Sequence, residues 1–318
     1  MADCHDLFEK FLEEITLHDS KKLNLIAARD ALREKIKTYF RDKKKFSVPK
    51  FHGQGSYMMR TVVNPLDGEY DIDDGVYLQH LGEDKSRWPS PSEAHKWIYE
   101  AVDGHTNEKP FEKPTCIRVI YVSNYHVDLP IYSSYKGDYY LADKNSGWRI
   151  SDPKSITDWF VEKVGEKGEQ LRNIVKYMKA WVDNQAQTNG KMPSSLIITK
   201  LVTDNFVSRV RDDVSLSKTV ASIDQLISQD FTVNNPIDNA EIISDRIDAN
   251  QKEVFKRLIK KMAENSESAI KEENKKKACT VWRKEFGDRF YDCNQIRDDK
   301  GALYTAAPAL LRNDARSA

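Results

Sequence analysis

The sequence has no excess of basic over acidic residues, which proteins that bind long nucleic acids usually have. Lysine plus arginine equals aspartate plus glutamate, at 50 residues each in a chain of 318. Proteins that grip a nucleic-acid polymer are usually basic, because neutralised phosphates supply much of that affinity. The balance favours a small charged ligand over a long polymer, and it leaves room for a local basic cleft. We therefore expect no long nucleic acid as a partner.

Cysteine and long apolar runs are also scarce. The four cysteines form no CxxC pair, which argues against a zinc site or a redox dithiol. We expect all four as free thiols in a reducing cytoplasm. No apolar run approaches the roughly 20 residues of a membrane span, and the acidic N-terminus is wrong for a signal peptide. These absences predict a cytoplasmic protein without a membrane partner.

The periodicities that are present predict an α+β fold. Phe8, Phe11, Leu12 and Ile15 follow helical spacing, and a second helix is expected from Ser20 to the charged stretch 41–45. A region of mixed strands follows, and the chain reads as helical from residue 152 onward. Strands are predicted near residues 72–78, 115–122, 125–132, 139–141 and 148–150. Later helices are predicted near residues 91–102, 153–164, 168–187, 194–209, 215–228, 239–264 and 267–286.

Two aspartates in one predicted strand suggest a metal site. Asp71 and Asp73 are separated by Ile72, so both carboxylates project from one face of the strand while the isoleucine points into the core. Carboxylates this close repel each other unless a cation lies between them. Mg²⁺ suits this position because it prefers oxygen ligands and commonly binds carboxylates together with substrate phosphates.

A third aspartate and a Gly-Ser pair complete the pattern. Asp128 lies in a later predicted strand, on the face opposite Val127 and Leu129. Two metal ions held by three carboxylates can stabilise both the attacking and the leaving oxygen of a phosphoryl transfer. The Gly55-Ser56 pair lets the backbone approach a triphosphate closely. Each motif alone is common, and a solvated acidic turn is the usual reason for Asp-x-Asp, but the combination predicts a nucleotidyltransferase site.

Several longer segments resemble the cGAS/DncV-like nucleotidyltransferases, bacterial second-messenger synthases of the CBASS anti-phage systems. The resemblance is strongest to the branch that makes cyclic GMP-AMP, and its order and approximate spacing hold over residues 50–200. The final helical segment, which ends at residues 286–289, fits more loosely. The matching segments are Gln54-Gly55-Ser56, Asp71-Ile72-Asp73-Asp74-Gly75, His126 to Tyr132, Ile150 to Lys154, Asp158-Trp159-Phe160 and Met178-Lys179-Ala180-Trp181.

The resemblance implies a polymerase-β-like catalytic lobe with a mixed or antiparallel sheet, packed against a helical lobe. The expected division is a catalytic lobe with the N-terminal helices over 1–150, a helical lobe over 151–297 that closes the nucleotide cleft, and a tail over 298–318. Asp71, Asp73 and Asp128 would be the catalytic residues and would bind two Mg²⁺ ions, with Mn²⁺ as a possible substitute. The nucleotide-binding residues would be Gln54, Gly55, Ser56, Arg118, Ser151, Lys179 and Ser195.

The expected activity is synthesis of a cyclic oligonucleotide, such as a cyclic dinucleotide like cGAMP, from ATP and GTP or other nucleoside triphosphates, with release of pyrophosphate. Two alternatives stay open: a nucleotidyltransferase acting on RNA 3′ ends, and a non-catalytic nucleotide sensor on the same fold. The resemblance also raises the possibility that a ubiquitin-transfer-like partner joins the C-terminal Ala318 to a target. We expect the last residues to be mobile.

Overall fold

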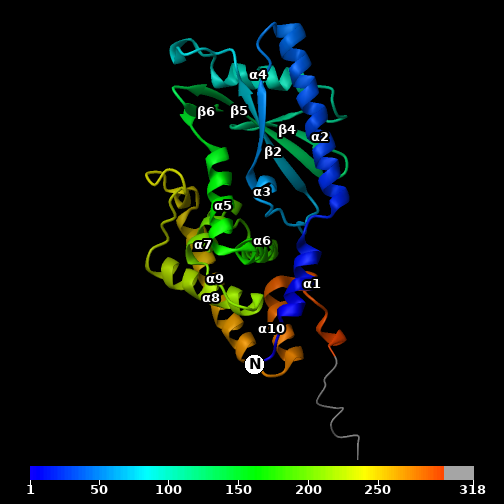
Figure 1. Cartoon of the computed structure of the whole chain (residues 1–318), viewed down its shortest axis with the longest axis vertical. Coiled ribbons are helices and arrows are strands. Elements are labelled where there is room, and N and C mark those ends of the chain that lie inside the picture. Colours follow the sequence, from blue (N-terminus) through cyan, green and yellow to red (C-terminus); the bar gives the residue numbers. More distant parts are fainter. Residues whose placement is uncertain (297–318) are drawn as a thin grey trace, which may run out of the picture.

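A computed structural model of the chain describes residues 1–296 and shows two lobes joined end to end. One lobe is a sheet with helices α2 and α4, and the other is a bundle of helices (Figure 1). This confirms the α+β fold with a mixed sheet and a helical lobe. No helix among residues 1–296 is long and apolar enough to cross a membrane.

The sheet has the order β1-β2-β5-β4-β3, and β6 joins β5 to β7. Strands β2 and β5 are parallel, whereas β1, β4 and β6 run antiparallel to the strands they pair with. The strands are β1 (Lys50–Gln54), β2 (Tyr70–Leu78), β3 (Phe111–Glu112), β4 (Cys116–Tyr121), β5 (Tyr125–Tyr135), β6 (Asp138–Asp143) and β7 (Gly147–Ile150).

One face of the sheet is apolar and is covered by α2 (Asp19–Thr38) and α4 (Pro91–Val102). Ile72 of β2 and Val127 and Leu129 of β5 pack in this core. Side chains alternate between the two faces of a strand, so the aspartates next to these residues project from the opposite face. The covering helices therefore fix the strands and leave the carboxylates on the face toward the helical lobe.

The helical lobe has its own core, and Trp181 and Trp282 are among its fully buried side chains. Its helices are α1 (His5–Ile15), α5 (Pro153–Lys167), α6 (Glu169–Asn189), α7 (Ser195–Asn205), α8 (Asp212–Gln229), α9 (Ala249–Lys271) and α10 (Lys275–Phe286). Shorter elements are α3 (Gly55–Met58), a π-helix at Tyr39–Lys44 that continues α2, and 3-10 helices at Lys85–Arg87, Ile243–Arg246, Gly287–Arg289 and Cys293–Gln295.

Helix α1 packs in the helical lobe, although the sequence grouped it with the sheet. Phe8 is fully buried and contacts the rings of Tyr177, Trp282 and Phe290 edge-on. Its apolar stripe fits the aromatic core formed by α6 and α10 more closely than the sheet, which α2 and α4 already cover. The chain therefore starts in one lobe and crosses to the other before β1.

Two other expectations were wrong. The predicted helix over 239–264 begins only at Ala249, where Asp248 and Gln251 form a reciprocal capping box; the preceding residues contain a bridge from Asn234 to Ile242 and a 3-10 turn. Cys279 and Cys293 form a disulfide between α10 and the segment after it, whereas Cys4 and Cys116 are free and buried, as expected.

Candidate active site

The parallel pairing of β2 with β5 brings the predicted aspartates together. The register places Asp73 beside Asp128 and Asp71 beside His126. Since residues two apart in a strand share a face, all four side chains lie on the face turned away from the apolar core. Ligand atoms of Asp71, His126 and Asp128 lie within 4.8 Å of one another, so the register alone forms a compact group of potential metal ligands.

The crowding of these carboxylates changes the pKa of Asp73. Burial, followed by repulsion from Asp71 and Asp128, raises the pKa of its carboxyl to about 8. A divalent ion among these carboxylates would remove the repulsion and displace the proton. Oxygen-rich donor sets of this kind suit Mg²⁺ or Mn²⁺, so the residues present fit a divalent metal centre.

Asp128 has a different environment from Asp73. Arg118 of β4 donates to both of its carboxylate oxygens, at 2.7 and 2.8 Å, and Lys113 lies 3.3 Å away. Burial would raise the pKa of Asp128, but the Arg118 hydrogen bonds and the Lys113 charge hold it below its usual range. The two paired strands therefore carry one carboxyl that retains a proton and one that is ionised.

Helix α3 brings the Gly-Ser pair against these carboxylates. Gly55 has a φ of +69°, and a Cβ added there would lie 2.4 Å from Oδ2 of Asp73, so no other residue fits. The backbone turns sharply here from β1 into α3. Gln54 is buried and its amide donates to the Tyr132 hydroxyl at 3.2 Å. The glycine thus lets the backbone pass directly over Asp73 and presents Ser56 to the cleft.

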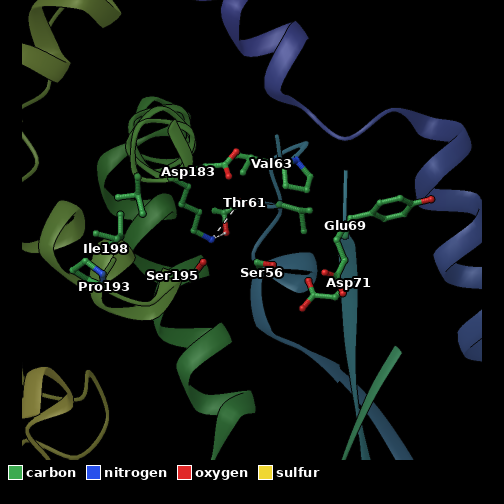
Figure 2. Close-up of a pocket in the computed structure, with 14 residues that line it drawn as sticks. Ser56, Thr61, Val63, Glu69, Asp71, Asp183, Pro193, Ser195 and Ile198 are labelled. Carbon is green, nitrogen blue, oxygen red and sulfur yellow. Dashed lines mark hydrogen bonds between the residues drawn. The ribbon is translucent and has the colours of Figure 1, made fainter. Parts of the chain in front are cut away.

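The opposite wall of the cleft comes from the helical lobe. Lys179 of α6 is buried and donates to the Thr61 hydroxyl at 2.8 Å. Burial lowers its pKa to about 7, an effect that Lys176 reinforces and Asp71 opposes. Ser195 begins α7 and lies across the gap from Ser56 and Asp71 (Figure 2). Both lobes therefore contribute polar groups to one cleft.

Two adjoining cavities, of about 560 and 280 Å³, form this cleft. They share four lining residues, Ser56, Asp71, Lys179 and Ser195. The larger cavity unites most of the residues predicted for the site: Gln54, Gly55, Ser56, Asp71, Asp73, Lys179 and Ser195.

Three predicted residues do not line either cavity: Asp128, Arg118 and Ser151. Asp128 lies beside Asp73 and is engaged by Arg118. Ser151 instead donates its backbone N–H to Tyr139 in the sheet. The structure therefore separates the residues that face the cleft from those that lie behind or beside it.

Sequence reasoning missed other groups at the cleft. Arg246 lines the larger cavity from the segment that was predicted to be helical, where no local motif marks it. Strand alternation already places His126 on the same face as Asp128, and we expected it to be a strand residue and not a metal ligand. It lies 3.5 Å from Asp71 and 3.0 Å from Glu69.

Two family models match the chain. One, described as the nucleotidyltransferase domain of cyclic GMP-AMP synthase DncV-like proteins, matches residues 49–132, and the other, the C-terminal domain of cyclic GMP-AMP synthase, matches residues 168–298. Together they cover more than half of the chain.

Curated relatives and solved structures agree with these matches. The chain is 31% identical over 260 residues to a cyclic GMP-AMP synthase of Escherichia albertii, which covers 76% of this chain and 58% of that protein. A cyclic GMP-AMP synthase of Escherichia coli is 28% identical, over 61% of this chain and 56% of that protein. The chain thus spans little more than half the length of these relatives.

The crystal structure of the Vibrio cholerae DncV cyclic AMP-GMP synthase has the same fold, with a TM-score of 0.76 at 19% identity over 92% of this chain and 98% of that one. The 3′-deoxy GTP bound form of Escherichia coli DncV has a TM-score of 0.72 at 21% identity, over 88% of this chain and 94% of that one. With matched models in both lobes and this fold, the chain belongs to the DncV-like nucleotidyltransferase family.

Proposed function

We propose that this protein is a nucleotidyltransferase that joins two nucleoside triphosphates, such as ATP and GTP, into a cyclic dinucleotide and releases pyrophosphate. The observation that carries the proposal is the cleft itself, where Asp71 and Asp73 of β2 meet Ser56, Lys179 and Ser195, with Asp128 of β5 directly beside Asp73. The relatives named cyclic GMP-AMP synthase support this product class. A Vibrio cholerae DncV structure that holds a linear intermediate, 5′ pppA(3′,5′)pG, supports synthesis in two steps.

Asp71, Asp73 and Asp128 would hold two Mg²⁺ ions, with His126 next to them. When bound, such ions neutralise charge on the triphosphate and on the leaving pyrophosphate. Mn²⁺ prefers similar ligands and would substitute. The close approach of Gly55 to Asp73 supports a position of the donor phosphates over these carboxylates.

The protein groups position both substrates. Ser56, Lys179 and Ser195 bind the donor triphosphate from two sides, with Lys179 as a point charge. Asp128, the ionised carboxylate, accepts the proton of the acceptor ribose hydroxyl, whose oxygen then attacks the α-phosphorus as the bond to pyrophosphate breaks. Arg118 must release an oxygen of Asp128 for this to occur. A second reaction of the same kind closes the ring.

The test is an incubation of the purified protein with all four nucleoside triphosphates and Mg²⁺, without RNA. We expect a cyclic dinucleotide by mass spectrometry and stoichiometric pyrophosphate. The double variant Asp71→Asn, Asp73→Asn should give no product while keeping its circular dichroism spectrum, and the exposed Asp84→Asn control should match the wild type. An active double variant would remove the proposal. In a parallel incubation with added RNA, elongation of that RNA in place of a cyclic product would favour RNA 3′-end transfer, and nucleotide binding without turnover would favour a sensor.

A role in anti-phage signalling follows from the family resemblance and belongs to the same proposal. Its test is phage plating on cells that carry the complete operon, with the Asp71→Asn, Asp73→Asn variant as the comparison. Conjugation of the C-terminus through Ala318 is also a proposal and concerns residues outside those the structure describes. Mass spectrometry of the protein co-expressed with neighbouring genes would detect the new isopeptide bond.

A further inference from the structure

A third cavity, of about 660 Å³, lies behind the cleft, between the start of α2, helix α3 and helix α6. Of its lining residues, only Val62 also lines a cavity of the cleft. Four cationic side chains line it, namely Lys22, Arg60, Arg172 and Lys176, and Glu169 is the one acidic side chain among the described residues at its wall. The chain as a whole has equal numbers of basic and acidic residues, so this excess of positive charge is local to the cavity.

The charges of these cations are only partly balanced within the protein. Lys176 is half-buried, and its nearest polar partner is the Thr16 hydroxyl at 3.4 Å. Burial, together with the charges of Lys22 and Arg172, lowers its pKa. Arg60 is exposed, and within residues 1–296 its side chain has no ion pair or hydrogen bond. The positive charges of Lys22 and Arg172 therefore act on Lys176, and neither Lys176 nor Arg60 has an acidic partner among residues 1–296.

The remaining contacts of the cations leave them able to bind a ligand. Arg172 pairs with Glu169 and donates to the Met59 carbonyl at 3.1 Å, which fixes its guanidinium at the wall. Lys22 pairs at 2.9 Å with Asp19, whose side chain is 92% exposed, and such exposed pairs contribute little free energy. An anion of two or more charges would replace this weak pairing and remove the repulsion among the cations.

Apolar side chains form the rest of the wall. Leu17, Tyr57, Met58 and Val62 line the same cavity, so it offers both a charged end and a surface for an organic group. We propose that this cavity is a second ligand site, distinct from the catalytic cleft, which binds a small organic phosphate through Lys22, Arg60, Arg172 and Lys176. Guanidinium groups match phosphate geometry, and lysines add unpaired charge.

Residues of this second site lie on the same helices as the residues proposed to bind the donor phosphates. Tyr57 follows Ser56 in α3, and Lys176 lies one turn before Lys179 in α6. The charge of Lys176 disfavours a proton on Lys179, so an anion bound at Lys176 would help Lys179 to stay charged. This consequence rests on the proposed function, whereas binding at the cavity does not.

Binding is tested by titration calorimetry with inorganic pyrophosphate in EDTA at low salt, which excludes metal-dependent binding at the carboxylates. The wild type should bind. Arg60→Gln, an exposed change that spares the fold, and Lys176→Gln should each weaken binding by about tenfold. Ser195→Ala in the cleft and Lys261→Gln, an exposed lysine at another cavity, should bind as the wild type does.

The outcomes separate the possibilities. No binding by the wild type, or equal weakening by Lys261→Gln, would overturn the site. Loss of binding in Ser195→Ala with retention in Lys176→Gln would place the pyrophosphate in the cleft and would also overturn it. Citrate, titrated in parallel, should bind more weakly than pyrophosphate; tighter binding of citrate would contradict the phosphate preference. Since no turnover is measured, these results do not depend on whether the protein makes a cyclic dinucleotide.

Discussion

Arg118 of β4 holds both carboxylate oxygens of Asp128 of β5, at 2.7 and 2.8 Å, across neighbouring antiparallel strands. The guanidinium keeps Asp128 ionised and at the same time occupies the oxygens that a metal ion would need. Arg118 therefore competes with a divalent cation for Asp128. In the proposed mechanism, the metal would therefore have to displace Arg118 from at least one of these oxygens.

Replacing Arg118 should consequently strengthen binding of the metal alone. In Arg118→Met, a competing cation is removed and the local potential becomes more negative, so we expect Mn²⁺ to bind roughly threefold to tenfold more tightly without nucleotide. Electron paramagnetic resonance of free Mn²⁺ measures this. Arg149→Met, which removes an arginine paired with Asp143 at the other edge of the sheet, should leave affinity unchanged. Weaker Mn²⁺ binding in Arg118→Met would show that the arginine supports the metal centre.

Asp73 makes the stability of the metal-free protein depend on pH. Its pKa is about 8 in the folded chain and near 3.8 when unfolded, so between these values the folded state binds more protons. Its contribution to the free energy of unfolding is therefore greatest at low pH and is lost as the pH rises toward 8. In EDTA, the thermal midpoint of the wild type should fall relative to that of Asp73→Asn between about pH 5 and pH 8.

The raised pKa of Asp73 also predicts that metal binding releases a proton. Adding Mg²⁺ to the wild type at pH 7 in a weakly buffered indicator solution should acidify it, because most of the Asp73 carboxyl is protonated beforehand. Asp73→Asn should abolish this release, and Asp84→Asn should retain it. Parallel pH profiles of wild type and Asp73→Asn, or equal acidification, would contradict the assigned pKa.

Strand periodicity predicted much of the site, because it depends only on neighbouring residues. The alternation around Ile72 and around Val127 predicts which aspartates leave the core. The pairing of β2 with β5 could not be predicted in the same way, because it places residues 55 positions apart beside one another, as with Asp73 and Asp128. No local rule supplies that pairing, and the three aspartates were grouped from the combination of motifs and then from the family resemblance.

Other features depend on tertiary partners and therefore left no local signal. The stripe of Phe8 and Phe11 predicts a helix, but its partners are Tyr177 and Phe286, far along the chain. In contrast, the start of α9 was predictable: Asp248 and Gln251 have the spacing of a capping box. The predicted helix nevertheless began at residue 239, about three turns before the observed start at Ala249.

The packing of α1 predicts that the helical lobe depends on the N-terminal segment. Phe8→Ala removes a fully buried ring from an aromatic cluster and should lower the free energy of unfolding by about 3–5 kcal/mol. Urea titration followed by circular dichroism measures this. Val161→Ala, at a side chain that is 47% exposed, should change it by less than about 0.5 kcal/mol. Equal effects of the two changes would mean that α1 is only loosely docked.

The lowered pKa of Lys179 predicts that the protein takes up protons when it binds nucleotide. Its pKa is about 7 in the free protein because of burial and the charge of Lys176, so at pH 8 it is mostly neutral. A bound triphosphate favours the charged form, and binding should therefore take up about one proton at pH 8. The same pKa predicts that affinity falls as the pH rises above 7.

Titration calorimetry with nonhydrolysable GTP in EDTA, repeated in buffers of different ionisation enthalpy, counts these protons. Lys179→Met should take up none, because the titrating amine is gone. Lys176→Gln should take up fewer than the wild type, since loss of the neighbouring charge lets Lys179 keep its proton before the nucleotide binds. Uptake that persists in Lys179→Met would assign the proton to another group, and uptake unchanged in Lys176→Gln would show that the two lysines, one turn apart on α6, are not electrostatically coupled.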